Sequence, residues 1–221
     1  MTALLPLGSM AQAKKDTVTL ALTLEPPVLD PTASASSSIA EVTQYNIFET
    51  LTKINPDGSV SPLLAESWDV SSDLKTYTFR LRKDVKFHNG EDFTAETVKF
   101  SFERAGSEKS TNKDKRTFTN MQVRVVDTHT VELVTEEIDP DFLFVLGQGT
   151  SIIVEPKSAA TNATKPVGTG PYKLGQWQKG ASITLVAWPQ YRDASRIRIQ
   201  RATFRFIPDA AAQVTALLAG D

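Results

Sequence analysis

Alternating polarity in residues 76–82 constrains this chain more than any other sequence feature. Every second position carries an apolar side chain, at Tyr77, Phe79 and Leu81. A period of two predicts a strand with one buried face and one hydrated face. A short apolar piece follows at 85–87 and runs into Asn89-Gly90, a strong turn dipeptide. The pattern therefore predicts a β-hairpin at the edge of a sheet.

Further segments carry the periodicity of strands or helices. We expect strands at 17–24, 121–126, 130–134, 172–178, 181–187 and 201–207. We expect helices from 34–38 to about 51, from a cap at Thr94, over 139–146, and over 209–219 between Asp209 and Gly220. Strands and helices mix without a steady βαβ repeat, so the fold class is α/β or mixed α+β with a mixed sheet.

Several motifs stand in an order that is specific when taken together. They are Glu25–Pro31, Tyr45–Leu51, Asp57-Gly58, Pro62–Trp68, the 65–90 stretch, Phe93–Arg104, Pro166–Leu174 and Ile207–Asp221. This series, over residues 17–221, resembles the family 5 extracellular solute-binding proteins, the periplasmic receptors of peptide, nickel and related ABC importers. The resemblance implies the first lobe of a type II-like periplasmic binding protein, with a mixed β-sheet and an inserted subdomain.

The resemblance also implies a domain organisation. Residues 14–54 and 164–221 would form the main part of the first lobe, and residues 55–163 the inserted subdomain. Members of the family continue beyond the position of Gly220-Asp221, so we expect an incomplete fold without its second lobe. Residues 1–13 are typical of the end of a signal peptide, with an apolar run and a small-residue cleavage site at Ala11-Gln12-Ala13.

Composition excludes some classes of protein. The formal net charge is −2 and basic residues are scattered, which argues against a nucleic-acid partner. The run Lys113–Arg116 is interrupted by an acid and is interpreted as a solvated loop. Arg196, Arg198 and Arg201 alternate with isoleucines and are interpreted as the wet face of a strand. No cysteine is present, which excludes disulfides and a lipidated cysteine, so a freely diffusing periplasmic protein is expected.

Nothing in the sequence indicates catalysis, a metal or a cofactor. His88 and His129 both lie at predicted turns, where a hydrogen-bonding role is expected. Gly168-Thr169-Gly170 is followed by Pro171, which removes an amide donor, so a structural turn with glycine at positive φ is expected instead of a phosphate loop. An unrecognised carboxylate hydrolase is kept only as a remote alternative.

Candidate substrate-binding residues fall in three groups. Where family members bind peptides, the segment matching Glu25, Pro26 and Pro27 lies along the ligand backbone; a purely structural role in an extended connection is an equal alternative. Gln44 and Tyr45 on the early helix form the second group. Gln148, Gly149 and Thr150, after an apolar run, form the third.

The resemblance predicts the solute-binding component of an ABC importer. It would capture a peptide or similar small solute between two lobes and present it to an ABC permease. The alternative is a truncated, non-transporting fragment without a competent ligand site. A single lobe offers one wall, so we expect weak or undetectable peptide binding and self-association through uncovered surface.

Overall fold

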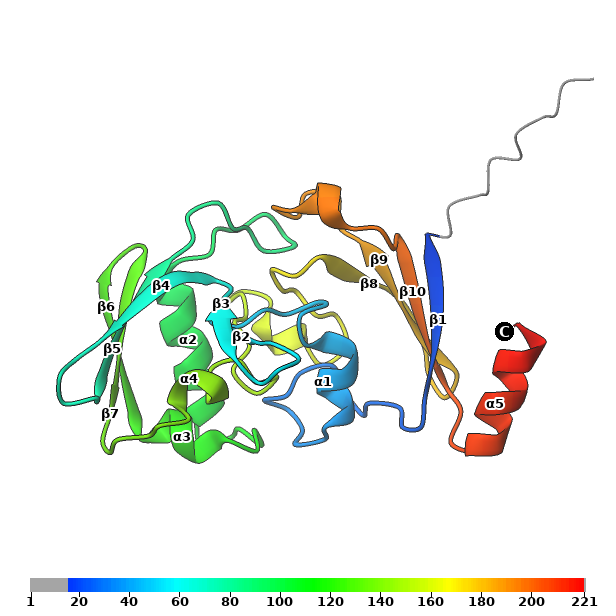
Figure 1. Ribbon diagram of the computed structural model, residues 1–221, viewed down its shortest axis with the longest axis horizontal. Helices are drawn as coiled ribbons and strands as arrows, with labels where there is room; N and C mark the ends of the chain where they lie inside the picture. Colours follow the sequence, from blue (N-terminus) through cyan, green and yellow to red (C-terminus); the bar gives the residue numbers. More distant parts are fainter. Residues whose placement is uncertain (1–15, 221) are drawn as a thin grey trace, which may run out of the picture.

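The computed structural model describes residues 16–220, which form two four-stranded sheets and a small two-stranded one. The four-stranded sheets lie toward opposite ends of the long axis of the molecule (Figure 1). The small sheet pairs β2 (Thr52–Ile54) with β3 (Val60–Pro62) and lies between them together with α1 (Ser38–Thr43). The structure is therefore mixed α/β, as the sequence predicts.

One four-stranded sheet is built from the middle of the sequence and is called the middle sheet for that reason. It is antiparallel throughout. Its strands are β4 (Ala65–Val70), β5 (Thr76–Leu81), β6 (Met121–Asp127) and β7 (Thr130–Thr135), in the order β4-β5-β7-β6. Tyr77, Phe79 and Leu81 are buried, which confirms the alternation. The expected edge position is wrong, because β5 lies between β4 and β7. Val85 and Phe87 are buried in a loop instead of a second strand.

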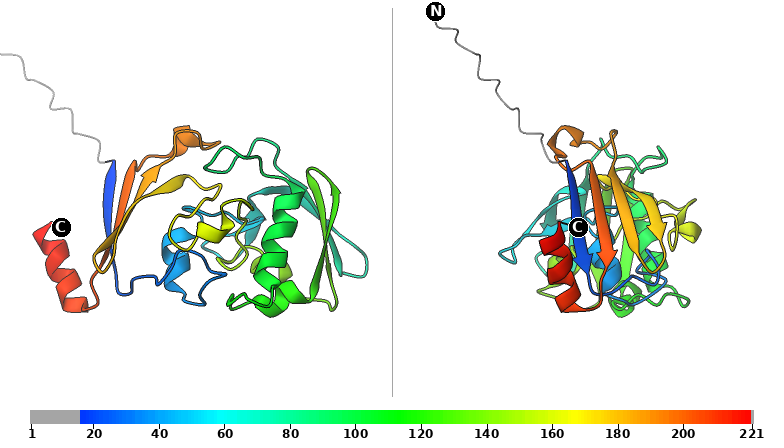
Figure 2. Two further views of the ribbon diagram at one scale, coloured as in Figure 1. Left: turned by 180° about the vertical axis from the view of Figure 1, so that it is seen from behind. Right: turned by 90° about the vertical axis from the view of Figure 1, so that its right-hand side faces the viewer.

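Helix α2 (Ala95–Gly106) covers the inner face of this sheet, and α3 (Lys115–Thr119) packs beside it (Figure 2). The chain enters α2 at Thr94, as predicted. The Thr94 amide donates to Thr97 Oγ1 at 3.2 Å, and that hydroxyl donates to the Thr94 carbonyl at 2.7 Å. Phe102 of α2 stacks on Phe118 of α3, with ring centroids 5.3 Å apart. Together these contacts close a core over the middle sheet.

The main sheet collects strands from both ends of the described chain. Its strands are β1 (Thr17–Leu22), β8 (Tyr172–Gln178), β9 (Ser182–Ala187) and β10 (Arg201–Phe206), in the order β1-β10-β9-β8. β1 runs parallel to β10 and the other pairs are antiparallel, so the sheet is mixed, as predicted. Helix α5 (Ala210–Ala219) lies outside this sheet, on the side away from the middle sheet (Figures 1 and 2).

Two helices differ from their predicted extents. α1 ends at Thr43 instead of near residue 51, because Tyr45 adopts a left-handed backbone conformation with φ of 58°. α4 is limited to Phe142–Val145. The ends of α5 are as predicted: Asp209 accepts from the amide of Ala212 at 2.7 Å, and Gly220 has φ of 82°.

Residues 168–170 form a strap that passes very close to the segment after α1. Gly168 and Gly170 are not among the glycines at positive φ, so that part of the prediction is wrong. Glycine is needed here for another reason: a Cβ on Gly168 would lie 2.0 Å from the Ile47 carbonyl oxygen, and one on Gly170 would lie 2.4 Å from that of Asn46. The Gly170 amide donates to the Ile47 carbonyl at 2.9 Å. The strap is structural, as predicted.

Two buried carboxylate–arginine pairs tie distant segments together. Glu49 accepts from both terminal nitrogens of Arg192, at 2.6 and 2.7 Å, and also from the hydroxyls of Thr169 and Tyr191. Asp30 accepts from Arg104 of α2 at 2.6 and 3.2 Å. Burial and the Glu49 charge raise the pKa of Tyr191 above its ordinary value, which keeps its hydroxyl protonated as a donor. The assignment of residues 55–163 to an inserted subdomain stays a prediction.

Candidate functional site

A cavity of about 260 Å³ opens between the loop before α1, α1 itself and the segment after α4. Its size is near the lower end of that of small-molecule sites. Four of the predicted binding residues line it together. The residues that line it are Pro31, Ser34, Ala35, Ser36, Ser37, Ala40, Gln44, Ile54, Lys113, Phe144, Gln148, Gly149 and Thr150. The structure thus brings two of the three predicted groups, about a hundred residues apart in sequence, to one place.

The carbonyl of Gly147 fastens α1 to the segment after α4. It accepts hydrogen bonds from Gln44 Nε2 at 2.8 Å and from the Tyr45 hydroxyl at 2.5 Å. The Tyr45 hydroxyl in turn accepts from the amide of Ile54 at 2.9 Å. Tyr45 is absent from the cavity lining, so the structure places it behind the wall as an anchor. The side-chain oxygen of Gln44, Oε1, accepts no hydrogen bond from residues 16–220 and is available to a bound molecule.

Gly149 and Thr150 form the facing wall. A Cβ on Gly149 would lie 2.7 Å from the Ala40 Cβ and 3.1 Å from Gln44 Oε1, so glycine permits the close approach of this wall to α1. The Thr150 hydroxyl donates to Asp114 at 2.5 Å, and the Thr150 carbonyl accepts from Asn112 at 2.8 Å. The loop 112–114 therefore holds Thr150 in place, and the Thr150 hydroxyl supplies a hydrogen-bond donor to the Asp114 carboxylate.

Lys113 is the cavity residue that sequence reasoning missed. It is exposed at the cavity rim, and its ammonium makes no hydrogen bond or ion pair within residues 16–220. The sequence signal was the run Lys113–Arg116, interpreted as a solvated loop. That interpretation is wrong for Lys115 and Arg116, because they form the first residues of α3. Nothing local in that run distinguishes Lys113, because only the packing of the loop against Thr150 directs it to the cavity. The site accordingly offers one cation, several hydroxyls and two glutamine side chains.

Glu25, Pro26 and Pro27 do not line this cavity. The Glu25 carboxylate accepts from Trp177 Nε1 at 2.8 Å and from the amide of Gly180 at 2.9 Å, both in the β8–β9 hairpin. Pro26 is buried and Pro27 is exposed. A ligand-binding role for these three residues stays a prediction, and the contacts of Glu25 describe the structural alternative.

His88 packs against Trp188, outside the cavity lining, and both of its ring nitrogens form hydrogen bonds within the structure. Its Nδ1 accepts from the amide of Gly168 at 3.3 Å, so Nε2 carries the proton and donates to the Gly170 carbonyl at 2.9 Å. Burial, with a smaller contribution from the Lys173 charge, outweighs the opposing hydrogen bond to Gly170 and lowers the pKa of His88 to about 4. Within residues 16–220, no three histidine or acidic side chains gather as a metal site, and no helix is long and apolar enough to cross a bilayer.

Residues 59–221 match the model of the bacterial extracellular solute-binding proteins, family 5 (middle part), and the chain belongs to this family. The family consists of binding proteins, so the chain belongs with binding proteins and not with enzymes.

Known relatives are similar over nearly all of this chain. Di/tripeptide-binding protein 1 of Pseudomonas aeruginosa is 30% identical over 89% of the chain and 42% of its own length. The probable D,D-dipeptide-binding periplasmic protein DdpA of Escherichia coli is 30% identical over 96% of the chain and 43% of its own length. The structure of AgaA from A. tumefaciens R10 with agropinic acid superposes with a TM-score of 0.85 and 31% identity, over 93% of this chain and 42% of that one. The chain thus spans less than half the length of these relatives.

Proposed function

We propose that this chain contributes to the periplasmic solute-binding component of an ABC importer, and that the cavity between α1 and Gln148–Thr150 holds the solute. The observation that carries the proposal is the convergence of Gln44, Gln148, Gly149 and Thr150 on one cavity. Membership of the family and the printed names of the relatives support a small solute of the peptide or opine kind. In this proposal the cavity forms one wall of the site, and closure of a second lobe over it supplies the other.

The charges at the cavity favour a solute with an anionic group. Lys113 brings the one cation of the described lining, and the lining holds no acidic side chain within residues 16–220. The neighbouring Asp114 is engaged by Thr150. A carboxylate at the rim would therefore meet Lys113, while the Gln44 and Gln148 amides and the serine hydroxyls would bind the polar backbone of a peptide-like solute. The ABC permease is the partner that this proposal implies.

Saturation-transfer NMR with a set of di- and tripeptides tests the proposal. With one wall of the site, we expect dissociation constants of about a millimolar. Lys113→Gln should weaken binding by roughly two- to fivefold, because it removes one exposed charge pair. Gly149→Ala should weaken it more, because the added Cβ meets Ala40 and Gln44. Lys165→Gln, an exposed cation away from the cavity, is the matched control. Equal binding by the unchanged chain and by both cavity variants would overturn the proposal, and undetectable binding would favour the alternative of a fragment without a competent ligand site.

A further inference from the structure

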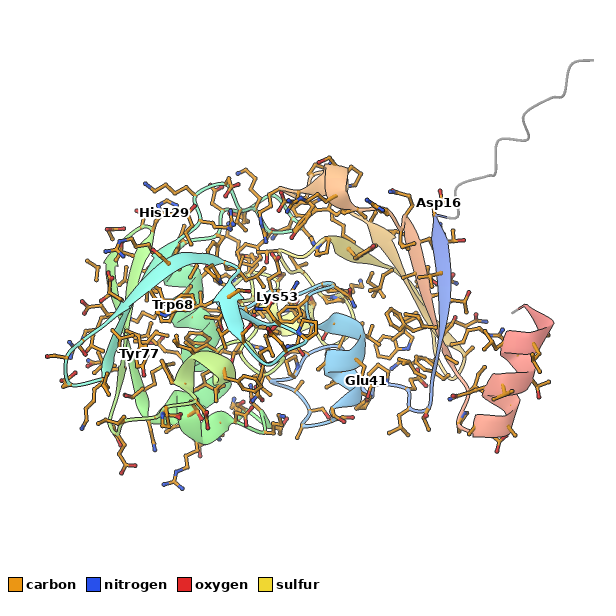
Figure 3. All side chains as sticks on the ribbon, viewed as in Figure 1. Asp16, Glu41, Lys53, Trp68, Tyr77 and His129 are labelled. Atoms are coloured by element: carbon orange, nitrogen blue, oxygen red, sulfur yellow. The ribbon has the colours of Figure 1, made fainter. Side chains whose placement is uncertain are left out.

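A second concave surface lies between the β2–β3 ribbon and the loop that precedes β10, and it is strongly basic. This groove has a volume of about 560 Å³. One wall contributes Lys53 and Arg82, and the other contributes Arg192, Arg196 and Arg198. The loop forms the orange segment at the upper edge of Figure 1, and Figure 3 labels Lys53 on β2. None of the eight predicted binding residues lines this groove.

The tertiary structure brings these arginines together in a way that the sequence does not indicate. The alternation around Arg196 and Arg198 predicted the wet face of a strand. That prediction is wrong for both residues, because Arg196 ends a short 3₁₀ turn (Ala194–Arg196) and Arg198 lies in the following loop, before β10 begins at Arg201. Both side chains are therefore free to face the groove instead of following a sheet.

The charge balance of the groove is opposite to that of the whole chain. The chain has a formal net charge of −2, whereas Asp193 is the one acid among the lining residues. Arg192 is compensated by Glu49. Setting that pair aside leaves four cations against one acid. The side chains of Arg196 and Arg198 have no hydrogen-bond or ion-pair partner within residues 16–220.

Arg192 also lines the groove, but its guanidinium is engaged inside the structure. Arg192 has a side chain 6% exposed, and its two terminal nitrogens are taken by Glu49. Its Nε is buried and has no hydrogen-bond partner within residues 16–220. Because this nitrogen is buried, a ligand in the groove would meet the exposed cations Lys53, Arg196 and Arg198 instead of Arg192.

The kind of anion follows from exposure and shape. Lys53, Arg196 and Arg198 are exposed, and an isolated exposed ion pair contributes little in water, so a single small anion would not be retained. Apolar residues separate the cations: Pro62 and Leu63 on one wall, Ile197 and Ile199 on the other. An extended chain with several carboxylates can engage several cations at once while its carbon atoms contact these apolar residues.

We propose that this groove binds an acidic, extended segment of a partner polypeptide, at a site separate from the solute cavity. Arginine suits such a ligand, because its planar guanidinium can bind a carboxylate through two parallel hydrogen bonds. The excess of positive charge in a concave surface also concentrates anions and speeds their association. The proposal does not depend on the identity of the transported solute.

Fluorescence anisotropy of a labelled octapeptide with four glutamates tests this proposal on the full chain. We expect binding at about 20 mM sodium chloride that weakens strongly at about 150 mM. The same peptide with glutamines should not bind. Arg196→Gln and Arg198→Gln should each weaken binding by roughly two- to fivefold, and the double variant by about tenfold. Arg124→Gln removes an exposed charge on β6, outside the groove, and should leave binding unchanged.

Three outcomes would overturn the proposal. The first is no binding of the glutamate peptide at low salt. The second is loss of binding in Lys113→Gln with no change in the Arg196 and Arg198 variants, which would place the peptide in the solute cavity. The third is competition by citrate or inorganic phosphate at the same concentration as the peptide, which would make the groove a site for compact anions.

Discussion

The middle sheet and the main sheet have the same number of strands but bury their residues to different degrees. In the middle sheet, Phe79 and Val131 are 0% exposed, and α2 covers the inner face. In the main sheet, no residue of β1 is buried, and α5 has no buried residue either. Consecutive hairpins and a local helix close the first core. The second sheet pairs segments from distant parts of the chain and leaves one edge strand and one helix with apolar surface exposed.

This difference suggests where stability resides. A core of local contacts forms with a small loss of chain entropy, whereas parallel pairing of β1 with β10 requires closure of a very long loop. We therefore expect the middle sheet to dominate the free energy of unfolding, and β1 and α5 to open locally at low cost.

A matched pair of alanine substitutions gives the largest expected difference in the free energy of unfolding. Phe79→Ala removes a fully buried ring from β5, so the free energy of unfolding should fall by about 4 kcal/mol. Leu217→Ala acts on a side chain that is 76% exposed on α5, and its effect should stay within about 0.5 kcal/mol. Urea denaturation measures both values. A cost above about 1 kcal/mol for Leu217→Ala would show that α5 is packed in solution, and would break the comparison.

The Glu49–Arg192 pair tests whether the two sheets unfold together. Glu49→Ala leaves a buried guanidinium without its partner, so the free energy of unfolding should fall by at least about 3 kcal/mol. Asp30→Ala should cost less, because Arg104 is 22% exposed and water can reach it. Tryptophan fluorescence in a Trp188→Phe background reports on Trp68 in the middle sheet and Trp177 in the main sheet. If the pair couples the sheets, unfolding of Glu49→Ala should separate into two transitions. A single unshifted transition would contradict the prediction.

His88 makes the junction between the sheets sensitive to acid. Its folded-state pKa of about 4 lies below the ordinary 6.5, so the unfolded chain binds the proton more readily. His88 is therefore neutral in both states above pH 6.5, and the free energy of unfolding decreases as the pH falls from 6.5 toward 4. The difference corresponds to roughly 3 kcal/mol. Urea titrations at pH 7 and pH 4 measure it.

The matched control for this pH dependence is His129, the half-buried histidine of the β6–β7 turn. His129→Gln should keep the loss of stability between pH 6.5 and pH 4, while His88→Gln should reduce it. Equal pH dependence of the two variants would show that the acid sensitivity arises elsewhere.

The smallest predicted effects come from two helix N-termini. Thr97→Val removes the hydroxyl that bonds the Thr94 backbone in α2, and should lower the free energy of unfolding by about 1 kcal/mol. Asp209→Ala removes the cap of α5 and should reduce helix content and amide protection in α5 alone, with no change in global stability. Hydrogen exchange read by mass spectrometry measures both. Equal global losses would mean that α5 belongs to the cooperative core.

Sequence reasoning succeeded where a short-range pattern carries the information. The buried face of β5, the start of α2 after Thr94 and the caps of α5 follow from local periodicity and capping chemistry. It failed where conformation depends on a distant neighbour. Gly168 and Gly170 are needed because the strap touches Ile47 and Asn46, and a reading of the turn alone points instead to positive φ. The early end of α1 at Thr43 is followed by Tyr45, whose hydroxyl donates to the Gly147 carbonyl about a hundred residues away.

The candidate site shows the same division between what local sequence patterns predict and what contacts between distant residues decide. The sequence by itself determined the family, the mixed fold class and the candidates Gln44, Gln148, Gly149 and Thr150, because motif order and strand or helix periodicity are local properties of the chain. The tertiary structure alone decided that these four residues share a cavity, that Lys113 joins them, and that Glu25 bonds the β8–β9 hairpin. It also decided that Arg196 and Arg198 face Arg82 across a groove. The physical reason is that a side chain's surroundings depend on contacts between residues far apart in sequence, which neither propensity nor spacing contains.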